Sequence, residues 1–365
     1  MRRGILTIAA VGLLTTGGLA ACGDDSGDGS GSTAERKPKI GVILPDSASS
    51  VRWETADRKY LEAAFKAAGV ESTIQNAQGD KAQFQTIADQ MMTEGVNVLM
   101  IVNLDSGTGK AVLDKAKSQG VLTIDYDRLT LGGSAEYYVS FDNEAVGKLQ
   151  GEGLVKCLTD KGAKNPVIAE LNGSETDNNA TLFKNGYDGV LKAKYDSKEY
   201  VKGPDQWVPA WDNAQAGTIF EQMMTQQNGK IDGVLAANDG LGNAVISVLK
   251  RNKLNGKVPV TGQDATVQGL QNILVGDQCM TVYKAVKKEA DAAAELAIAL
   301  AKGEKKAAPT TVRDPEGNRD VPAVLLEPKA IYKENVKDVV ADGYVTKEEL
   351  CKDAFAAACT EAGVS

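Results

Sequence analysis

The chain has 365 residues and a formal net charge of −8 at pH 7, with 41 Lys and Arg against 49 Asp and Glu. An acidic chain without a basic run is a poor candidate for nucleic-acid binding, so we expect no nucleic-acid partner. Histidine is absent, which excludes histidine-dependent hydrolytic triads and most catalytic zinc sites.

The N-terminal residues 1–22 have the layout of an export signal. Arg2 and Arg3 precede an apolar run over 5–14 that is too short to cross a bilayer, and Leu19-Ala20-Ala21-Cys22 follows. A cysteine directly after Leu-Ala-Ala is typical of a bacterial lipoprotein signal, in which that cysteine is lipidated. Residues 23–37 are rich in Gly, Ser and Asp near their start, and we expect a flexible tether. The sequence therefore predicts an extracytoplasmic protein with Cys22 as its lipid anchor to the cell membrane.

From Lys39 onward, short apolar runs alternate with amphipathic stretches. The runs predict strands at 40–44, 73–75, 96–102, 122–127, 137–141, 167–171, 234–237, 258–262 and 280–283. The stretches predict helices that include 54–68, 82–94, 107–119, 143–158, 179–194, 213–227 and 286–301. Such alternation indicates βαβ units and parallel sheets covered on both faces. Because these strands exceed one comfortable sheet, we predict an α/β protein with two doubly wound, Rossmann-like lobes.

Several predicted strands end in polar side chains. Asp127 and Arg128 follow one strand, Asn238 another, Asp264 a third and Lys284 a fourth. Ligands of open α/β sheets bind at the carboxyl ends of strands. These residues therefore predict a polar binding cleft between the lobes, although loops are polar in general and any one of them alone would mean little.

Two apparent ion or phosphate motifs fail on inspection. Residues 106–110 resemble a phosphate-binding loop, but Leu104 stands where its first glycine is needed and Ala111 follows the lysine. Residues 338–349 resemble a calcium loop, but Val340 occupies a ligand position. A turn before a helix capped by Thr346 explains the second stretch equally well. We expect no metal and no cofactor.

If Cys22 carries lipid, Cys157, Cys279, Cys351 and Cys359 remain. An even number in an oxidising compartment predicts disulfides, and four cysteines allow three pairings. If 346–361 is one helix, Cys351 and Cys359 lie about 12 Å apart, beyond disulfide reach. Each would then pair with Cys157 or Cys279.

All three tryptophans, Trp53, Trp207 and Trp211, fall in predicted loops. An indole face can stack on the apolar face of a pyranose ring, while Asp, Asn, Arg and Lys bind its hydroxyls. A loop tryptophan can equally pack on its own lobe, and we expect Trp207 to be the structural copy.

Over residues 39–350 the sequence resembles the xylose-binding proteins of bacterial ABC sugar importers, within the ribose/galactose-binding class of periplasmic proteins. The resemblance rests on motifs in the same order, namely Arg52-Trp53, 126–128, 140–144, 173–174, 177–179, 205–207, Trp211, 238–239, 262–264 and 280–284.

The resemblance implies that a sugar is clasped by Arg52, Asp127, Arg128, Asp177, Asn179, Asn238, Asp264 and Lys284, with Trp53 and Trp211 as its aromatic faces. The family pattern has a lysine three positions after the arginine of Arg-Trp, where this chain has Thr55. This departure leaves the identity of the monosaccharide open, with xylose expected first.

The implied fold is a type I periplasmic binding protein, whose lobes are joined by three crossovers. We expect these near 142–143, near 281–283 and between Arg313 and Pro322. The N-terminal lobe would comprise 38–142 plus 283–320, the C-terminal lobe 143–282 plus 321–345, and residues 346–365 a C-terminal helix.

The implied function is that of a monomeric binding protein, which closes on a monosaccharide and docks on ABC permease subunits without catalysing a reaction. One alternative is a sensor that presents sugar to a membrane receptor. Another is an exported glycoside hydrolase that uses Asp127 and Asp177, but neither carboxylate has the apolar pocket that keeps a catalytic acid protonated. A repressor of related fold is excluded, because the sequence lacks an N-terminal DNA-binding helix pair.

Overall fold

The computed structural model describes residues 37–364, so the predicted signal, tether and Cys22 lie outside the described residues. The N-terminal lobe is built on a seven-stranded sheet with the order β10-β11-β5-β4-β3-β1-β2. Its pairs are parallel except β10 with β11. The strands are β1 (Lys39–Leu44), β2 (Glu71–Asn76), β3 (Val98–Ile101), β4 (Leu122–Tyr126), β5 (Tyr137–Phe141), β10 (Thr310–Asp314) and β11 (Arg319–Leu326).

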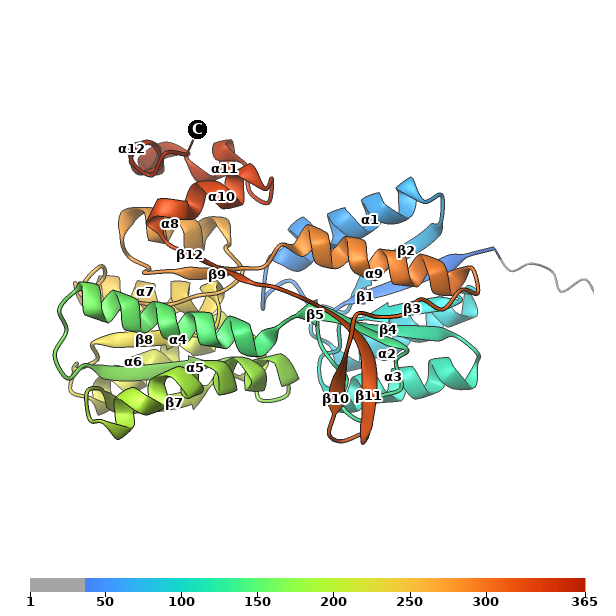
Figure 1. Cartoon of the computed structure of the whole chain (residues 1–365), viewed down its shortest axis with the longest axis horizontal. Coiled ribbons are helices and arrows are strands. Elements are labelled where there is room, and N and C mark those ends of the chain that lie inside the picture. Colours follow the sequence, from blue (N-terminus) through green and yellow to red (C-terminus); the bar gives the residue numbers. More distant parts are fainter. Residues whose placement is uncertain (1–36, 365) are drawn as a thin grey trace, which may run out of the picture. The chain divides into compact units, whose positions relative to one another are not determined.

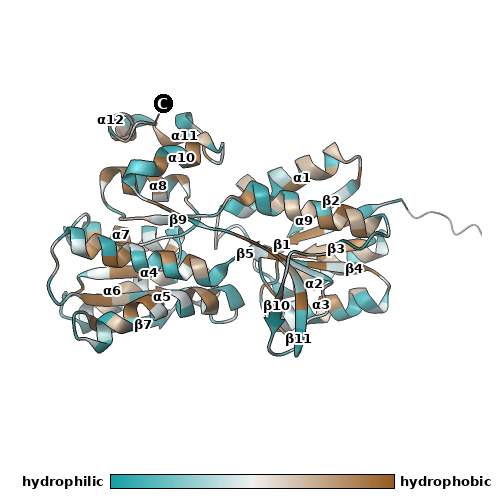
Figure 2. Cartoon of the chain, viewed as in Figure 1, coloured by the Kyte–Doolittle hydropathy of each residue, from teal (hydrophilic) through white to brown (hydrophobic). Residues whose placement is uncertain are grey.

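Helices cover both faces of this sheet (Figure 1). They are α1 (Arg58–Ala67), α2 (Lys81–Thr93), α3 (Ser106–Ser118) and α9 (Val286–Ala301), with a π-helical turn η1 (Trp53–Asp57) before α1. Ile40, Val42 and Leu44 point to the core beneath α1 and α9. Ile43 points to the other core, beneath α2 and α3. The strand alternation thus fills two apolar layers. The central strands of the sheet, such as β1 and β3, are largely brown in Figure 2.

The C-terminal lobe contains a three-stranded parallel sheet with the order β7-β6-β8. Val260 extends it by a single parallel bridge to Val234. The strands are β6 (Val167–Asn172), β7 (Val201–Trp207) and β8 (Gly233–Ala236), and β9 (Thr281–Tyr283) pairs antiparallel with β12 (Lys329–Ile331). The helices are α4 (Asn143–Asp160), α5 (Asn178–Asp196), α6 (Asn213–Gln226), α7 (Asp239–Arg251) and α8 (Val267–Val275), with a 3₁₀ turn η2 (Pro209–Trp211). This lobe has a core of its own, so the α/β fold has two lobes.

The chain passes between the lobes after β5, between β9 and α9, and after β11. The third of these differs from our expectation. Residues 310–326 form a hairpin whose second strand pairs with β5, so the chain leaves the first sheet only after Leu326. Residues 315–318 form the turn of this hairpin and are not the crossover that we expected there. The two are alike in sequence, because a hairpin turn and a connection between domains have the same polar composition. The division into lobes stays a prediction, with its last limit moved to Leu326.

The predicted single C-terminal helix is wrong. The segment contains η3 (Lys333–Asn335), α10 (Val336–Ala341), α11 (Lys347–Leu350), η4 (Asp353–Phe355) and α12 (Ala356–Glu361). Asp353 has φ 51°, a left-handed conformation that interrupts the helix. The chain turns back there, and Cys351 bonds to Cys359 across a Cα–Cα distance of 5.7 Å.

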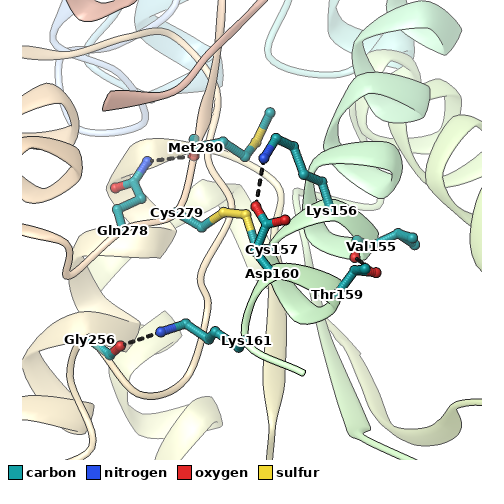
Figure 3. The surroundings of a disulfide bond; sticks show 10 residues. All are labelled: Val155, Lys156, Cys157, Thr159, Asp160, Lys161, Gly256, Gln278, Cys279 and Met280. Atoms are coloured by element: carbon teal, nitrogen blue, oxygen red, sulfur yellow. Dashed lines mark hydrogen bonds and ion pairs between the residues drawn. A yellow bond between two sulfur atoms is a disulfide. The ribbon is translucent and has the colours of Figure 1, made fainter. Parts of the chain in front are cut away.

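The second disulfide joins Cys157 on α4 to Cys279, just before β9 (Figure 3). Our pairing of each C-terminal cysteine with Cys157 or Cys279 is therefore wrong, because it assumed an unbroken helix. The disulfide holds the long α4 against the strand that leads to the second crossover. Nearby, the Lys161 ammonium donates to the Gly256 carbonyl at 2.7 Å.

Over residues 37–364, no helix is both long and apolar enough to cross a membrane. The same residues contain no group of His, Cys, Asp and Glu side chains arranged to hold a metal ion.

Candidate functional site

All of the predicted sugar-binding residues line one cavity, which we call the central cavity. Both lobes and the second crossover contribute to it, and its empty volume is about 320 Å³, including space open to solvent. The predicted residues around it are Arg52, Trp53, Asp127, Arg128, Asp177, Asn179, Trp211, Asn238, Asp264 and Lys284. Ser49, Ser50, Phe183 and Gln263 complete the lining. The sequence thus predicted most of the wall of one cavity from segments far apart in the chain.

Arg52 is held rigidly at the base of the central cavity, with its side chain 1% exposed. Its Nε and Nη2 donate to the Asp57 carboxylate, each at 2.9 Å, and Nη2 also donates to Glu289 at 2.9 Å. The Tyr126 hydroxyl donates to Asp57 at 2.7 Å. Burial alone would lower the pKa of Arg52, but its carboxylate neighbours outweigh this and raise it. Only Nη1, which lies 3.1 Å from Asp127 Oδ2, is left for the cavity.

Asp127 is a carboxylate from the N-terminal lobe, presented by an unusual backbone. It follows β4 with φ 62°, and its amide donates to the Val139 carbonyl of β5 at 2.7 Å. Its own carbonyl accepts from Ser140 Oγ at 2.7 Å and from Asn179 Nδ2 at 2.9 Å. Burial alone would raise the pKa of Asp127, but Arg52, Lys284 and Arg128 outweigh this and lower it. Asp127 is therefore ionised and available as a hydrogen-bond acceptor.

Asp264 is the corresponding carboxylate of the C-terminal lobe, and its backbone also has a positive φ. It follows the bridge at Val260 with φ 95°, and its amide donates to the Val282 carbonyl of β9 at 2.8 Å. Its Oδ2 accepts from Ser50 Oγ of the other lobe at 3.0 Å, and its Oδ1 lies 3.2 Å from the Lys284 ammonium. That Oδ1 atom is buried and has no hydrogen-bond partner among the described residues.

Asp239 is another buried carboxylate, and it is hydrogen-bonded to the loop that carries Asp264. Its oxygens accept from Gln278 Nε2 and Thr281 Oγ1 at 2.8 Å each, and from the Thr266 amide at 2.8 Å. Burial raises the pKa of Asp239 to about 7, and Asp264 adds to the effect. These bonds tie the end of the loop at Thr266, and the neighbouring segment that leads into β9, to the start of α7, so the left-handed backbone at Asp264 is fixed by its surroundings.

Two further cavity residues also cap helices. Asp177 Oδ1 accepts from the Asn179 amide at the start of α5, at 2.9 Å. Asn238 Oδ1 accepts from the Leu241 amide at the start of α7, also at 2.9 Å. An N-cap fixes the side chain as well as the helix. The other side-chain atoms are also engaged, because Asp177 Oδ2 accepts from Trp211 Nε1 and Asn238 Nδ2 donates to the Ser49 carbonyl, so both side chains are fixed in the cavity wall.

Each of the two cavity tryptophans, Trp53 and Trp211, is fixed by a hydrogen bond from its indole N–H. Trp53 Nε1 donates to Ser49 Oγ at 3.2 Å, while the Arg52 guanidinium carbon lies 4.4 Å from the ring centroid. Trp211 Nε1 donates to Asp177 Oδ2 at 3.1 Å. A Cβ at Gly173 would lie 2.1 Å from the Trp211 ring, so glycine there makes room for it.

The charges that line the central cavity balance. Arg52, Arg128 and Lys284 are cationic, and Asp127, Asp177 and Asp264 are anionic; the Arg128 Nε–Asp177 Oδ2 distance is 3.0 Å. A buried charge is tolerated only when it is paired, and a net charge on the ligand would leave one unpaired. The cavity therefore suits a neutral ligand with many hydroxyl groups, each able to donate to a carboxylate and accept from a cation.

Thr55 and Trp207 lie outside the central cavity. Thr55 is exposed, and its hydroxyl donates to the Val51 carbonyl at 2.9 Å. Trp207 is half-buried against the C-terminal core, and its structural role stays a prediction.

The residues that the sequence did not single out have local signals. Ser49 and Ser50 directly precede Arg52-Trp53, and Phe183 lies one turn after Asn179 on the same face of α5. Gln263 stands next to Asp264 at the end of its strand. Each could have been found by extending a recognised motif by one turn or a few residues.

Comparisons with known proteins agree with the fold. A model of the periplasmic binding protein domain matches residues 40–305. The D-xylose-binding periplasmic protein of Escherichia coli is 36% identical over 316 residues, which are 86% of this chain and 93% of that protein. That of Haemophilus influenzae is 35% identical, over 88% of this chain and 94% of that protein.

A carbohydrate-transporter solute-binding protein from Chloroflexus aurantiacus, solved with D-glucose, superposes with a TM-score of 0.78 at 27% identity. The match covers 86% of this chain and 98% of that one. These matches define an extracytoplasmic solute-binding protein of type I fold, not an enzyme. The chain belongs to the periplasmic sugar-binding family that includes the D-xylose-binding proteins of ABC importers.

Proposed function

We propose that this protein binds a monosaccharide, D-xylose first, between its two lobes and delivers it to an ABC permease. The observation that carries the proposal is the convergence of three cations, three carboxylates and two tryptophans on one cavity without net charge. The names of the relatives, two D-xylose-binding proteins among them, support the same class of ligand. The ten residues predicted from the sequence are the proposed sugar contacts.

We propose that the lobes close on the sugar by a hinge motion at the three crossovers. In the closed cleft, Asp127 and Asp264 accept from sugar hydroxyls, and Arg52 and Lys284 donate to them. Trp53 and Trp211 contact the faces of the ring. A chain that acts alone in this way needs no second subunit, so we propose a monomer.

Calorimetric titration with a panel of aldopentoses and aldohexoses tests the ligand. We expect a dissociation constant at or below micromolar for at least one of them, which corresponds to about 8 kcal/mol or more. An amino acid and a dipeptide serve as charged controls and should not bind. A flat titration with every monosaccharide, together with binding of either control, would contradict the proposal.

We also propose that Cys22 carries the lipid that attaches the protein to the cell membrane. The basis is the Leu-Ala-Ala-Cys sequence and the polar segment behind it. Two or more acyl chains suffice for stable attachment, at about 0.8 kcal/mol per buried CH₂. Cys22→Ser should release the protein from the membrane fraction, as measured by fractionation and immunoblotting. Retention of that variant in the membrane would refute the anchor.

A further inference from the structure

The charged groups of the central cavity are divided unequally between its two halves. The half formed by the N-terminal lobe and the second crossover holds three cations and three carboxylates. The cations are Arg52, Arg128 and Lys284, and the carboxylates are Asp127 in the lining and Asp57 and Glu289 directly behind Arg52. Among the described residues that line the half from the C-terminal lobe there are two carboxylates, Asp177 and Asp264, and no cation.

The two halves are in contact in this structure. Asp177 Oδ2 lies 3.0 Å from Arg128 Nε, and Asp264 Oδ1 lies 3.2 Å from the Lys284 ammonium. Two cations of the first half are thus paired with carboxylates of the other lobe. With the lobes together, five buried carboxylates surround three cations. Unpaired charge is costly in a buried site, so this arrangement favours a proton on one of the carboxylates.

Glu289 is the carboxyl group best placed to hold that proton. It is the fourth residue of α9, which begins directly after the second crossover (Figure 1), and its side chain is fully buried. Its Oε2 accepts from Arg52 Nη2 at 2.9 Å, while its Oε1 is buried without a hydrogen-bond partner among the described residues. Asp57, by contrast, accepts two hydrogen bonds from Arg52 and one from the Tyr126 hydroxyl. Three such donors stabilise a charged carboxylate, and Glu289 has only one of them.

The surroundings of Glu289 also favour its neutral form. The charged and titratable side chains around it are Arg52, Asp57, Tyr126, Asp127, Tyr138 and Lys284. Burial raises the pKa of Glu289 well above its usual range. Arg52 opposes this effect, but Asp127 and Asp57 add to it, because a second negative charge is unfavourable beside theirs.

We propose that Glu289 holds Arg52 as a neutral carboxylic acid, and that the protein takes up a proton at Glu289 when its lobes close on a sugar. The sugar and the closure are those of the proposed function, on which this inference rests. With the lobes apart, the first half has equal numbers of positive and negative groups, and Glu289 loses its proton more readily. Closure adds the two carboxylates of the C-terminal lobe and excludes water, which strengthens the repulsion between carboxylates. Glu289 is therefore a positioning residue, which acts on the sugar only through Arg52.

Calorimetry on the full-length protein tests this inference with the monosaccharide that binds. Titrations at one pH in two buffers of different ionisation enthalpy, such as phosphate and Tris, give the number of protons taken up per sugar. Between pH 6 and 9 we expect an uptake that rises toward one proton. Sugar affinity should fall as pH rises, by at most tenfold per pH unit, because the bound form keeps a proton that the free form has lost.

Two variants of Glu289 separate the proton from the hydrogen bond. Glu289→Ala removes the group that fixes Arg52 Nη2 and should weaken sugar binding by about tenfold. Glu289→Gln restores the hydrogen bond without a titratable group. It should bring the affinity at pH 6 to within threefold of the unmodified protein, lose most of the proton uptake, and bind more tightly than the unmodified protein at pH 9.

Glu295→Gln is the matched control, because Glu295 lies on the same helix but is exposed and paired with Lys306 at 2.6 Å. It should change neither the affinity nor the proton uptake. Thermal unfolding without sugar shows whether each variant is folded, and Glu289→Gln keeps the test valid if Glu289→Ala does not fold.

The failures are distinguishable. If the sugar binds without proton uptake at every pH from 6 to 9, or if the uptake persists in Glu289→Gln, the inference is wrong while the proposed function stands. If folded Glu289→Gln binds the sugar more than threefold more weakly at pH 6, Glu289 acts as a charged carboxylate and the inference also fails. If no monosaccharide binds at all, both proposals fail together.

Discussion

Replacing Asp264 by Asn removes one charge from the central cavity and little else. Asp264 is 5% exposed, and its carboxylate lies 3.2 Å from the Lys284 ammonium. A second carboxylate, that of Asp127, lies 3.9 Å from the same ammonium. Asn keeps the volume of Asp and tolerates φ 95° better than Ala does. The variant thus separates the loss of charge from backbone strain.

The magnitude follows from the hydrogen bonds that the carboxylate makes. A hydrogen bond to a charged group contributes about 1.5–3 kcal/mol, and 1.4 kcal/mol is one decade in affinity. Asp264→Asn should therefore weaken sugar binding by about tenfold to hundredfold. Asp264→Ala should weaken it by at least tenfold and should also lower the thermal stability of the unliganded protein, because Ala is strained at this backbone position.

Calorimetry with the best monosaccharide measures the effect, and thermal unfolding without sugar shows whether each variant is folded. Asp89→Asn is the matched control, because Asp89 is an exposed carboxylate paired with Lys115 far from the cavity lining. It should change affinity by less than twofold. If Asp264→Asn also binds within twofold of the unmodified protein, Asp264 does not contact the sugar and the assignment of the cleft is wrong.

Further predictions concern stacking, pH and the disulfides. Trp211→Ala should weaken monosaccharide binding by about tenfold through lost stacking, and an affinity within twofold of the unmodified protein would refute its role. Because the pKa of Asp239 is about 7 in the folded protein and about 3.9 when unfolded, the folded state binds the extra proton between pH 4 and 7. Thermal stability should therefore fall as pH rises through that window, and Asp239→Asn should flatten the profile. In chemical denaturation, Cys279→Ser should cost about 5 kcal/mol and Cys351→Ser about 2.6 kcal/mol, since the closed loops span 122 and 8 residues; equal losses would contradict this account.

The central cavity could be predicted because its residues follow strand ends. Parallel strands bring their carboxyl ends to one edge of a sheet, so side chains such as Asp127 and Asn238 had to lie near a common cleft. The resemblance to sugar-binding proteins then selected the positions within each loop. The sequence did not predict the buried carboxylates that contact the cavity residues. Asp57 is close to Arg52 in the chain, but Glu289 contacts Arg52, and Asp239 contacts the loop of Asp264, from segments that are distant in the sequence.

The sequence pattern did not predict the strands that lack an uninterrupted apolar run. The strand β7 contains Gly203 and Pro204, which normally break strands, and it was not predicted. It is an edge strand with an irregular register opposite β6. Proline is tolerated at such an edge because its missing N–H costs no ladder hydrogen bond. The hairpin of β10 and β11 was missed for a related reason, since β10 is largely exposed and polar and Pro322 interrupts the apolar run of β11.

Several polar contacts join the two lobes, such as that of Arg128 with Asp177, and two of them involve the loop at Ser49 and Ser50. Ser50 Oγ donates to Asp264, and Asn238 Nδ2 donates to the Ser49 carbonyl at 3.2 Å. Lys284, at the second crossover, lies between the carboxylates of Asp127 and Asp264 from opposite lobes. A ligand shifts a conformational equilibrium only through contacts that one state lacks. In the proposed complex, a sugar that bridges Asp127 and Asp264 makes such contacts only when the lobes are together, so these two proposed sugar ligands would also be the groups through which binding favours closure.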